Sequence, residues 1–176
     1  MLKAIISLIK SLNSNSHPGE IAHAVSIGVL LGLMPKDNAL WYILFIFFAF
    51  VRINKAVYLL VILGMSLFAH TLDMYLDQIG YMVLTYEPAY PVYRFLLDIP
   101  FIAFTKFNNT IVMGSLVSGI VLYIPVYIFA RLFIKLWRST LAPKIASSKL
   151  WSGFKKLPLI KKIYAISEDI SGVVKR

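Results

Sequence analysis

Long apolar runs separated by short polar breaks dominate the chain. The first two, Ile21–Met34 and Ala39–Val51, contain 14 and 13 residues and flank the polar turn Pro35–Asn38. The next two, Ala56–Leu72 and Thr110–Ala130, contain 17 and 21 residues without a Lys, Arg, Asp or Glu. Uninterrupted apolar runs of these lengths predict helices, and the two longer runs reach or approach the length that crosses a bilayer.

The two shorter runs predict a helical hairpin over residues 16–51, with Pro18 and Glu20 suited to the first helical turn. Helices of this size are roughly 20 Å long, whereas the hydrocarbon core of a bilayer is about 30 Å thick. We therefore expect a re-entrant hairpin, whose turn lies at membrane depth and is buried in protein. Two short, tilted spans with the turn outside the membrane are the alternative.

The chain from residue 56 to residue 137 predicts two spans joined by an outer loop. The first span covers residues 56–84, and the second covers residues 108–137 and contains Pro125, which we expect to kink the helix. The loop between them, residues 85–107, is rich in Pro and Tyr. Tyrosine is favoured where a membrane meets water, because its ring can be buried while its hydroxyl stays hydrated.

Both ends of the chain predict amphipathic helices. Residues 1–15 place lysines opposite an apolar stripe, and residues 138–176 form a basic tail with a second stripe from Leu159 to Val174. Helices of this kind lie on a membrane surface or pack against the protein's own body.

Composition favours lipid as the surrounding solvent. The chain is 59% hydrophobic and 15% charged, with a mean hydropathy of +0.77, whereas soluble domains carry about 25% charged residues. It has no cysteine, which excludes disulfides and thiolate metal sites. No cleavable signal peptide is expected, since Lys10 interrupts the first apolar stretch. The expected fold is all-α: a polytopic integral membrane helical bundle with a re-entrant helical hairpin and amphipathic terminal helices.

Charge predicts the orientation of this bundle. The net charge is +10, and the segment from Arg131 to Arg176 holds 11 basic and 2 acidic residues, which leaves only +1 for the rest. Basic segments stay on the cytoplasmic side, so we expect both termini in the cytoplasm and the loop outside. The tail would then contact anionic lipids of the inner leaflet. Because lipid charge explains this tail, we expect no nucleic-acid partner.

Charged residues near the predicted hairpin are the first functional candidates. Ionisable side chains at membrane depth are costly and usually functional, whereas in an exposed turn they are ordinary loop residues. The candidate polar turn or pathway consists of Lys36, Asp37, Asn38, Arg52 and Asn54.

Small residues at helical spacing form a second group, composed of Ala24, Gly28, Gly32, Gly114 and Ser118. Stripes of small side chains let helix backbones approach closely, and helix packing is the preferred interpretation. In the alternative, the first three line a crevice with Lys36 at its base.

A third group is a weak polar cluster: Glu20, His23, His70 and Asp73. Glu-x-x-His spacing occurs in carboxylate metal sites, but pairs of this kind often arise by chance. Hydrogen bonding at the membrane interface is the preferred interpretation, and no metal site and no cofactor are expected. The chain has no phosphate-binding loop, nucleophile elbow, zinc-protease or dinucleotide motif, so we do not expect an enzyme.

A spaced pattern in residues 16–84 resembles a known family. It consists of Pro18-Gly19-Glu20, Ala22, Ala24, Ile27-Gly28, Gly32, Pro35 and Arg52-x-Asn54. The pattern resembles a widespread bacterial inner-membrane family classed as a domain of unknown function. The family usually has a Gly where this chain has Asp37-Asn38, and tends to carry Asn-Pro where this chain has Phe68-Ala69-His70. The resemblance implies a divergent bacterial inner-membrane protein and brings no activity with it.

These features favour a non-enzymatic membrane subunit or anchor for another envelope protein complex, with an envelope protein or a second copy as partner. The alternative is a transporter or flippase-like protein for lipids or small anions that uses the hairpin. Short helices joined by a Pro turn are similar in kind to the broken helices of transporters.

Overall fold

The computed structural model describes residues 17–141, and every regular element among them is a helix. The sequence-based expectation of an all-helical fold is confirmed there. The predicted N-terminal helix and nearly all of the predicted tail lie outside the described residues. The chain divides into two compact units, residues 1–134 and 135–176. The elements are α2 (Pro18–Leu33), α3 (Ala39–Phe50), α4 (Lys55–Leu84), the 3-10 turn η1 (Glu87–Ala89), α5 (Tyr90–Asp98), the 3-10 turn η2 (Ile102–Thr105), α6 (Thr110–Leu136) and the π turn η3 (Trp137–Leu141).

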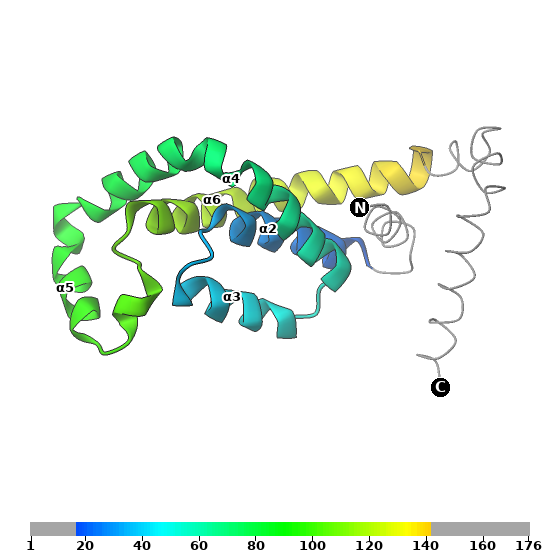
Figure 1. The fold of residues 1–176 in the computed structure, drawn as a ribbon. Helices are drawn as coiled ribbons and strands as arrows, with labels where there is room; N and C mark the ends of the chain where they lie inside the picture. Colours follow the sequence, from blue (N-terminus) through cyan, green and yellow to red (C-terminus); the bar gives the residue numbers. More distant parts are fainter. Residues whose placement is uncertain (1–16, 142–176) are drawn as a thin grey trace. The chain divides into compact units, whose positions relative to one another are not determined.

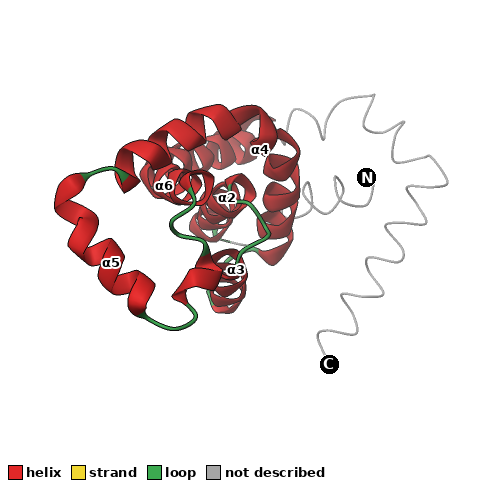
Figure 2. Cartoon of the chain, turned by 60° about the vertical axis from the view of Figure 1, so that its left-hand side comes forward, coloured by secondary structure: helices red, strands yellow, loops and turns green. Residues whose placement is uncertain are grey.

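Helix α2 is the most buried element of the first unit. Pro18 starts it, and it ends at Leu33, since residues that precede a proline such as Pro35 disfavour the helical conformation. Ile21, Ala24 and Leu31 are completely inaccessible. Figure 2 shows α2 between α3 on one side and α4 and α6 on the other. Its apolar residues therefore have neighbouring helices on several sides, which explains an apolar composition without an amphipathic face.

Helices α2 and α4 run parallel and in register (Figure 1). A Cβ on Gly28 would lie 2.8 Å from the Cβ of Val61, and one on Gly32 would overlap Met65. Both pairs are 33 residues apart, and the same offset recurs where the Asn54 amide donates to the Glu20 carbonyl at 3.4 Å. By this register the turn after α2 lies level with His70 of α4, about 25 Å along the helix from Asn54.

Helix α3 returns antiparallel to α2 and packs on it through one side only. The Trp41 indole donates to the Leu31 carbonyl at 2.9 Å, and the Tyr58 hydroxyl of α4 donates to the Phe45 carbonyl at 3.0 Å. Trp41 is the one buried residue of α3. The opposite side is apolar and exposed, and consists of Tyr42, Ile43, Ile46, Phe47 and Phe50.

Helices α4 and α6 cross at two glycines. A Cβ on Gly80 would overlap the carbonyl oxygen of Thr110, and one on Gly114 would overlap the carbonyl oxygen of Leu76. Backbones this close leave no room for a side chain, which is the packing mode that small residues permit in membrane helices. Helix α6 continues without a break through Pro125.

Two helices are long and apolar enough to cross a membrane: Lys55–Leu84 and Thr110–Thr140. Only 22% of the most apolar 18-residue window of each is buried. A core helix of a soluble protein would be mostly covered by its neighbours, whereas these two expose most of their apolar surface.

Residues 85–109 form an arm between α4 and α6. The arm contains α5, a short amphipathic helix, and η2, which returns the chain to the N-terminal end of α3. Its exposed side chains include the aromatic residues Phe95, Phe101 and Phe104. This arm occupies the segment for which the sequence predicted an outer loop.

Candidate functional site

The polar turn between α2 and α3 assigns a different role to each of its three candidate residues. The Lys36 ammonium donates to the Met34 carbonyl at 3.2 Å, and partial burial lowers the pKa of Lys36. Asp37 is 68% exposed and pairs with Lys106 of the arm, with 2.6 Å between the ammonium and the carboxylate. The hydrogen bond from Lys106 is the main cause of the lowered pKa of Asp37.

Asn38 closes the same turn and is 3% exposed. Its side-chain oxygen accepts from the Trp41 amide at 2.8 Å, and its side-chain nitrogen donates to the Pro35 carbonyl at 2.7 Å. It therefore caps α3 and ties both sides of the turn together. These bonds occupy the side-chain amide with structural work, so a ligand would have to displace them.

Arg52 and Asn54 lie at the other end of the hairpin. The Arg52 guanidinium is 3.3 Å from the Glu20 carboxylate, and 90% of its side chain is exposed. The Asn54 side chain caps α4 by accepting from the Val57 amide at 3.1 Å. By the register of α2 and α4, these residues are about 25 Å from Asp37. The five candidate turn or pathway residues thus divide into two polar layers at opposite ends of α2, and do not form one site.

The small-residue stripe of α2 is closed by packing. Ala24 is inaccessible, and the space beside Gly28 and Gly32 is occupied by Val61 and Met65 of α4. On α6, Gly114 forms the crossing with α4, and the buried Ser118 hydroxyl has no hydrogen-bond partner. No crevice runs along this stripe in the described helices.

The four residues of the weak polar cluster form separate pairs. Glu20 turns to Arg52, while the ring of His23 lies 2.6 Å from the Tyr123 hydroxyl of α6 and stacks near Tyr127. His70 and Asp73 pair with each other at 3.0 Å on the exposed side of α4. Residues 17–141 contain no group of three His, Asp or Glu side chains able to hold a metal ion.

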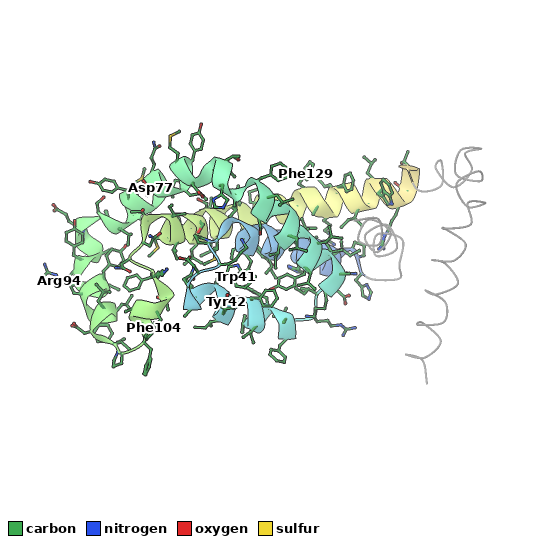
Figure 3. The ribbon with its side chains drawn as sticks, viewed as in Figure 1. Trp41, Tyr42, Asp77, Arg94, Phe104 and Phe129 are labelled. Carbon is green, nitrogen blue, oxygen red and sulfur yellow. The ribbon has the colours of Figure 1, made fainter. Side chains whose placement is uncertain are left out.

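The structure also joins residues that sequence reasoning did not select. Thr110 donates to Asp77, which ties the start of α6 to α4, and Lys106 fixes the arm to the hairpin turn. Figure 3 shows Asp77 on α4, with Arg94 and Phe104 on the arm. Lys106 is one of only two basic residues in the predicted outer loop, a signal that its charge has a particular partner.

Beneath α5 lies a cavity of about 260 Å³. Leu84, Tyr93, Leu97 and Phe107 contribute apolar or aromatic lining, and Arg94 and Asn108 contribute polar groups. Sequence reasoning did not find this site, because its walls come from the end of α4, one face of α5 and the segment before α6.

Chemically, the described polar groups mostly satisfy one another. The acidic groups at both ends of the hairpin are paired with cations, and the buried amide of Asn38 is hydrogen-bonded on both sides. Such an arrangement orients helices and binds ions weakly, and it supplies no activated nucleophile with an adjacent base.

Comparisons with known proteins agree with this picture. Residues 5–141 match the family model described as "Uncharacterized protein conserved in bacteria (DUF2062)". An uncharacterized protein of Treponema pallidum (strain Nichols) is 36% identical over 162 residues, which cover 92% of this chain and 100% of that protein. No solved structure matches the chain.

Proposed function

The chain belongs to the bacterial family DUF2062, and from that premise we propose that it is a non-enzymatic subunit or anchor of an envelope protein complex in the inner membrane. Its helical bundle would reside in the bilayer, and its polar ends would engage a partner protein. The sequence resemblance to an inner-membrane family supports the location.

One observation carries this proposal: the bundle exposes apolar surface on several helices at once. Exposed residues include Phe47 of α3, Leu67 of α4 and Phe129 of α6, at 60%, 77% and 73%. Figure 3 shows Phe129 on an outer side of α6. Soluble monomers rarely expose apolar patches beyond a few hundred Å², so a surface of this kind favours lipid or a protein partner.

The two polar layers support a multi-pass arrangement. Glu20 and Arg52 mark one layer, and Asp37 and Lys106 mark the other, about 25 Å apart along α2. The positive-inside rule assigns the first layer and both termini to the cytoplasm, with the basic tail on anionic lipid. The arm then lies outside.

The exposure of Asp37 bears on the depth of the hairpin turn. A charged pair facing hydrocarbon would be costly, so a side chain that protein leaves 68% exposed needs water or lipid headgroups around it. This favours two short spans over the re-entrant hairpin that the lengths of the apolar runs predict. Both arrangements leave the orientation of the remaining chain unchanged.

Reciprocal affinity capture from mild detergent tests the proposed anchoring role. The full chain, tagged and expressed at its native level, should be recovered in a fixed ratio with one envelope protein, and that protein should capture the chain in return. Photocrosslinkers at Tyr42 and Phe47 of α3 would identify the contact, with Phe129 of α6 as a matched exposed aromatic position. A chain recovered alone, without crosslinks to a protein or to a second copy, would refute the role.

A second candidate function, a transporter or flippase-like protein for lipids or small anions, has a specific observation behind it. Lys36 is partly buried beside the Asp37–Lys106 pair, and half-buried charges of this kind line substrate pathways in transporters. The closed stripe at Gly28 and Gly32 argues against an open path in this conformation.

Uptake or lipid scrambling in vesicles that contain the full chain tests this candidate. Lys36→Gln and Asp37→Asn should each lower the rate severalfold, while Arg52→Gln in the other polar layer should leave it unchanged. Equal rates in all variants would remove the transport reading.

A further inference from the structure

We propose that the cavity beneath α5 binds the headgroup of an anionic phospholipid, with Arg94 pairing to its phosphate. This inference rests on the membrane residence in the proposed function, and is independent of any protein partner. The lipid would come from the leaflet in which α5 lies.

The cavity has fixed walls. The Tyr93 hydroxyl donates to the Val83 carbonyl at 3.0 Å, which ties α5 to the end of α4. The ring of Tyr93 also lies 6.3 Å from the ring of Phe107, a residue that is 8% exposed. Nearby, the glycine crossing at Gly80 and Gly114 holds α4 against α6. The space between these anchored elements is therefore part of the fold.

Arg94 supplies the charge complementarity. The other cation of the arm, Lys106, is already paired with Asp37. The ion pairs among residues 17–141 do not include Arg94, whose side chain projects from α5 in Figure 3. A guanidinium presents a planar set of donors that matches a phosphate in a bidentate manner. Asn108, on the same lining, offers an amide for a second polar contact.

The surroundings of the cavity favour a lipid over free phosphate. Helix α5 exposes Val92 and Phe95, and the arm continues with exposed Phe101 and Phe104. A helix with a broad apolar face and a narrow polar edge lies in the plane of a membrane interface. A soluble anion would contact Arg94 alone, whereas a phospholipid would also place its glycerol and upper chains against Leu97 and Phe107.

The size of the cavity sets which part of the lipid enters. Its volume of about 260 Å³ is just below the range of complete small-molecule pockets, roughly 300–1,000 Å³. It accommodates the phosphate and glycerol region, and the chains would remain in the bilayer beside the arm.

Photocrosslinking in nanodiscs tests the proposal. The full chain is placed in phosphatidylcholine discs that contain a photoactivatable phosphatidylglycerol, and crosslinked peptides are identified by mass spectrometry. We expect crosslinks within residues 84–108, reduced at least fivefold in Arg94→Gln and retained in Arg52→Gln. Leu97→Trp, which fills the cavity and keeps the arginine, should reduce them as well.

Crosslinks to the basic tail serve as an internal control, because they depend on charge and not on the cavity. If tail crosslinks persist and those at residues 84–108 are absent or unchanged in Arg94→Gln, the lipid site is refuted and membrane residence stands. If the chain does not incorporate into discs at all, the proposed function fails first. Loss of the crosslinks at residues 84–108 in millimolar inorganic phosphate would identify a free-anion site and overturn the assignment to lipid.

Discussion

At the scale of single residues, backbone contacts at glycines and hydrogen bonds at one asparagine fix the geometry of the bundle. Gly80 and Gly114 are required by the close crossing of α4 and α6, while the space beside Gly64 on α4 is open to 4 Å. Glycine is a poor helix former, so at Gly64 nothing in the described structure offsets its cost. This contrast provides a matched pair of substitutions.

Gly80→Ala should destabilise the protein, because the new methyl group meets the Thr110 carbonyl oxygen, a backbone atom that cannot rotate away. Overpacking of this kind costs roughly 3 kcal/mol. Gly64→Ala should instead stabilise by up to about 1 kcal/mol through helix propensity. Unfolding of both variants in mixed detergent micelles, followed by circular dichroism, measures the difference. Equal stability of the two would contradict the close crossing.

The Asp37–Lys106 pair predicts a small, acid-sensitive contribution to stability. The pKa of Asp37 is lowered by the hydrogen bond from Lys106, so the pair stabilises the fold fully above the ordinary aspartate pKa of about 3.9. The contribution is lost as the pH falls through the lowered value. Both side chains are largely exposed, so it should stay within a fraction of 1 kcal/mol.

A carbon NMR titration of the Asp37 carboxyl group checks this prediction. In Lys106→Gln the pKa of Asp37 should rise toward its ordinary value, whereas Arg52→Gln, in the other polar layer, should leave it in place. An unchanged titration in Lys106→Gln would show that the pair does not form in solution.

At the scale of elements, the α2–α3 hairpin illustrates what pattern reasoning can reach. The two apolar runs and the break at Pro35 predicted the helices and the turn to within a few residues, because a proline and a cluster of polar residues end helices locally. The partners of the turn could not be predicted in this way. Lys106 is 69 residues from Asp37 along the chain, and no local rule connects them.

Asn38→Ala should loosen this hairpin, since it removes the cap of α3 and leaves the Pro35 carbonyl and the Trp41 amide without partners. We expect a loss of about 2 kcal/mol, near the upper end for helix caps. Asn38→Ser, which can still cap through its hydroxyl, should lose about half as much. Thermal unfolding in detergent compares the two, and a serine variant as unstable as the alanine variant would refute the capping role.

At the scale of the whole molecule, the two polar layers at the ends of α2 define the expected orientation. The absence of cysteine in the sequence allows single cysteines to report it. Asp37, in the turn, and Tyr90, on the arm, should react with a membrane-impermeant thiol reagent in intact cells. Ser171, in the basic tail, should react only after the membrane is permeabilised.

Reaction at Tyr90 without reaction at Asp37 would support a re-entrant hairpin, with its turn held at membrane depth. Reaction at Ser171 in intact cells would reverse the orientation inferred from charge. These outcomes are independent of the lipid site under α5 and of any protein partner.

The sequence by itself determined the helical fold, the positions of the helices and the two helices long enough to span a bilayer. It could do so because apolar run length, proline and charge act locally along the chain. It also identified the small residues of α2 and Gly114, since spacing along one helix reveals a stripe.

Only the tertiary structure decided what those residues meet. The arrangement of the helices placed Val61 and Met65 against the α2 stripe, divided the polar candidates between two layers, and paired Asp37 with Lys106. It also built the cavity under α5 from three segments far apart in the chain. Contacts between distant residues depend on how complete helices pack, and the periodicity of a single helix contains no information about its neighbours.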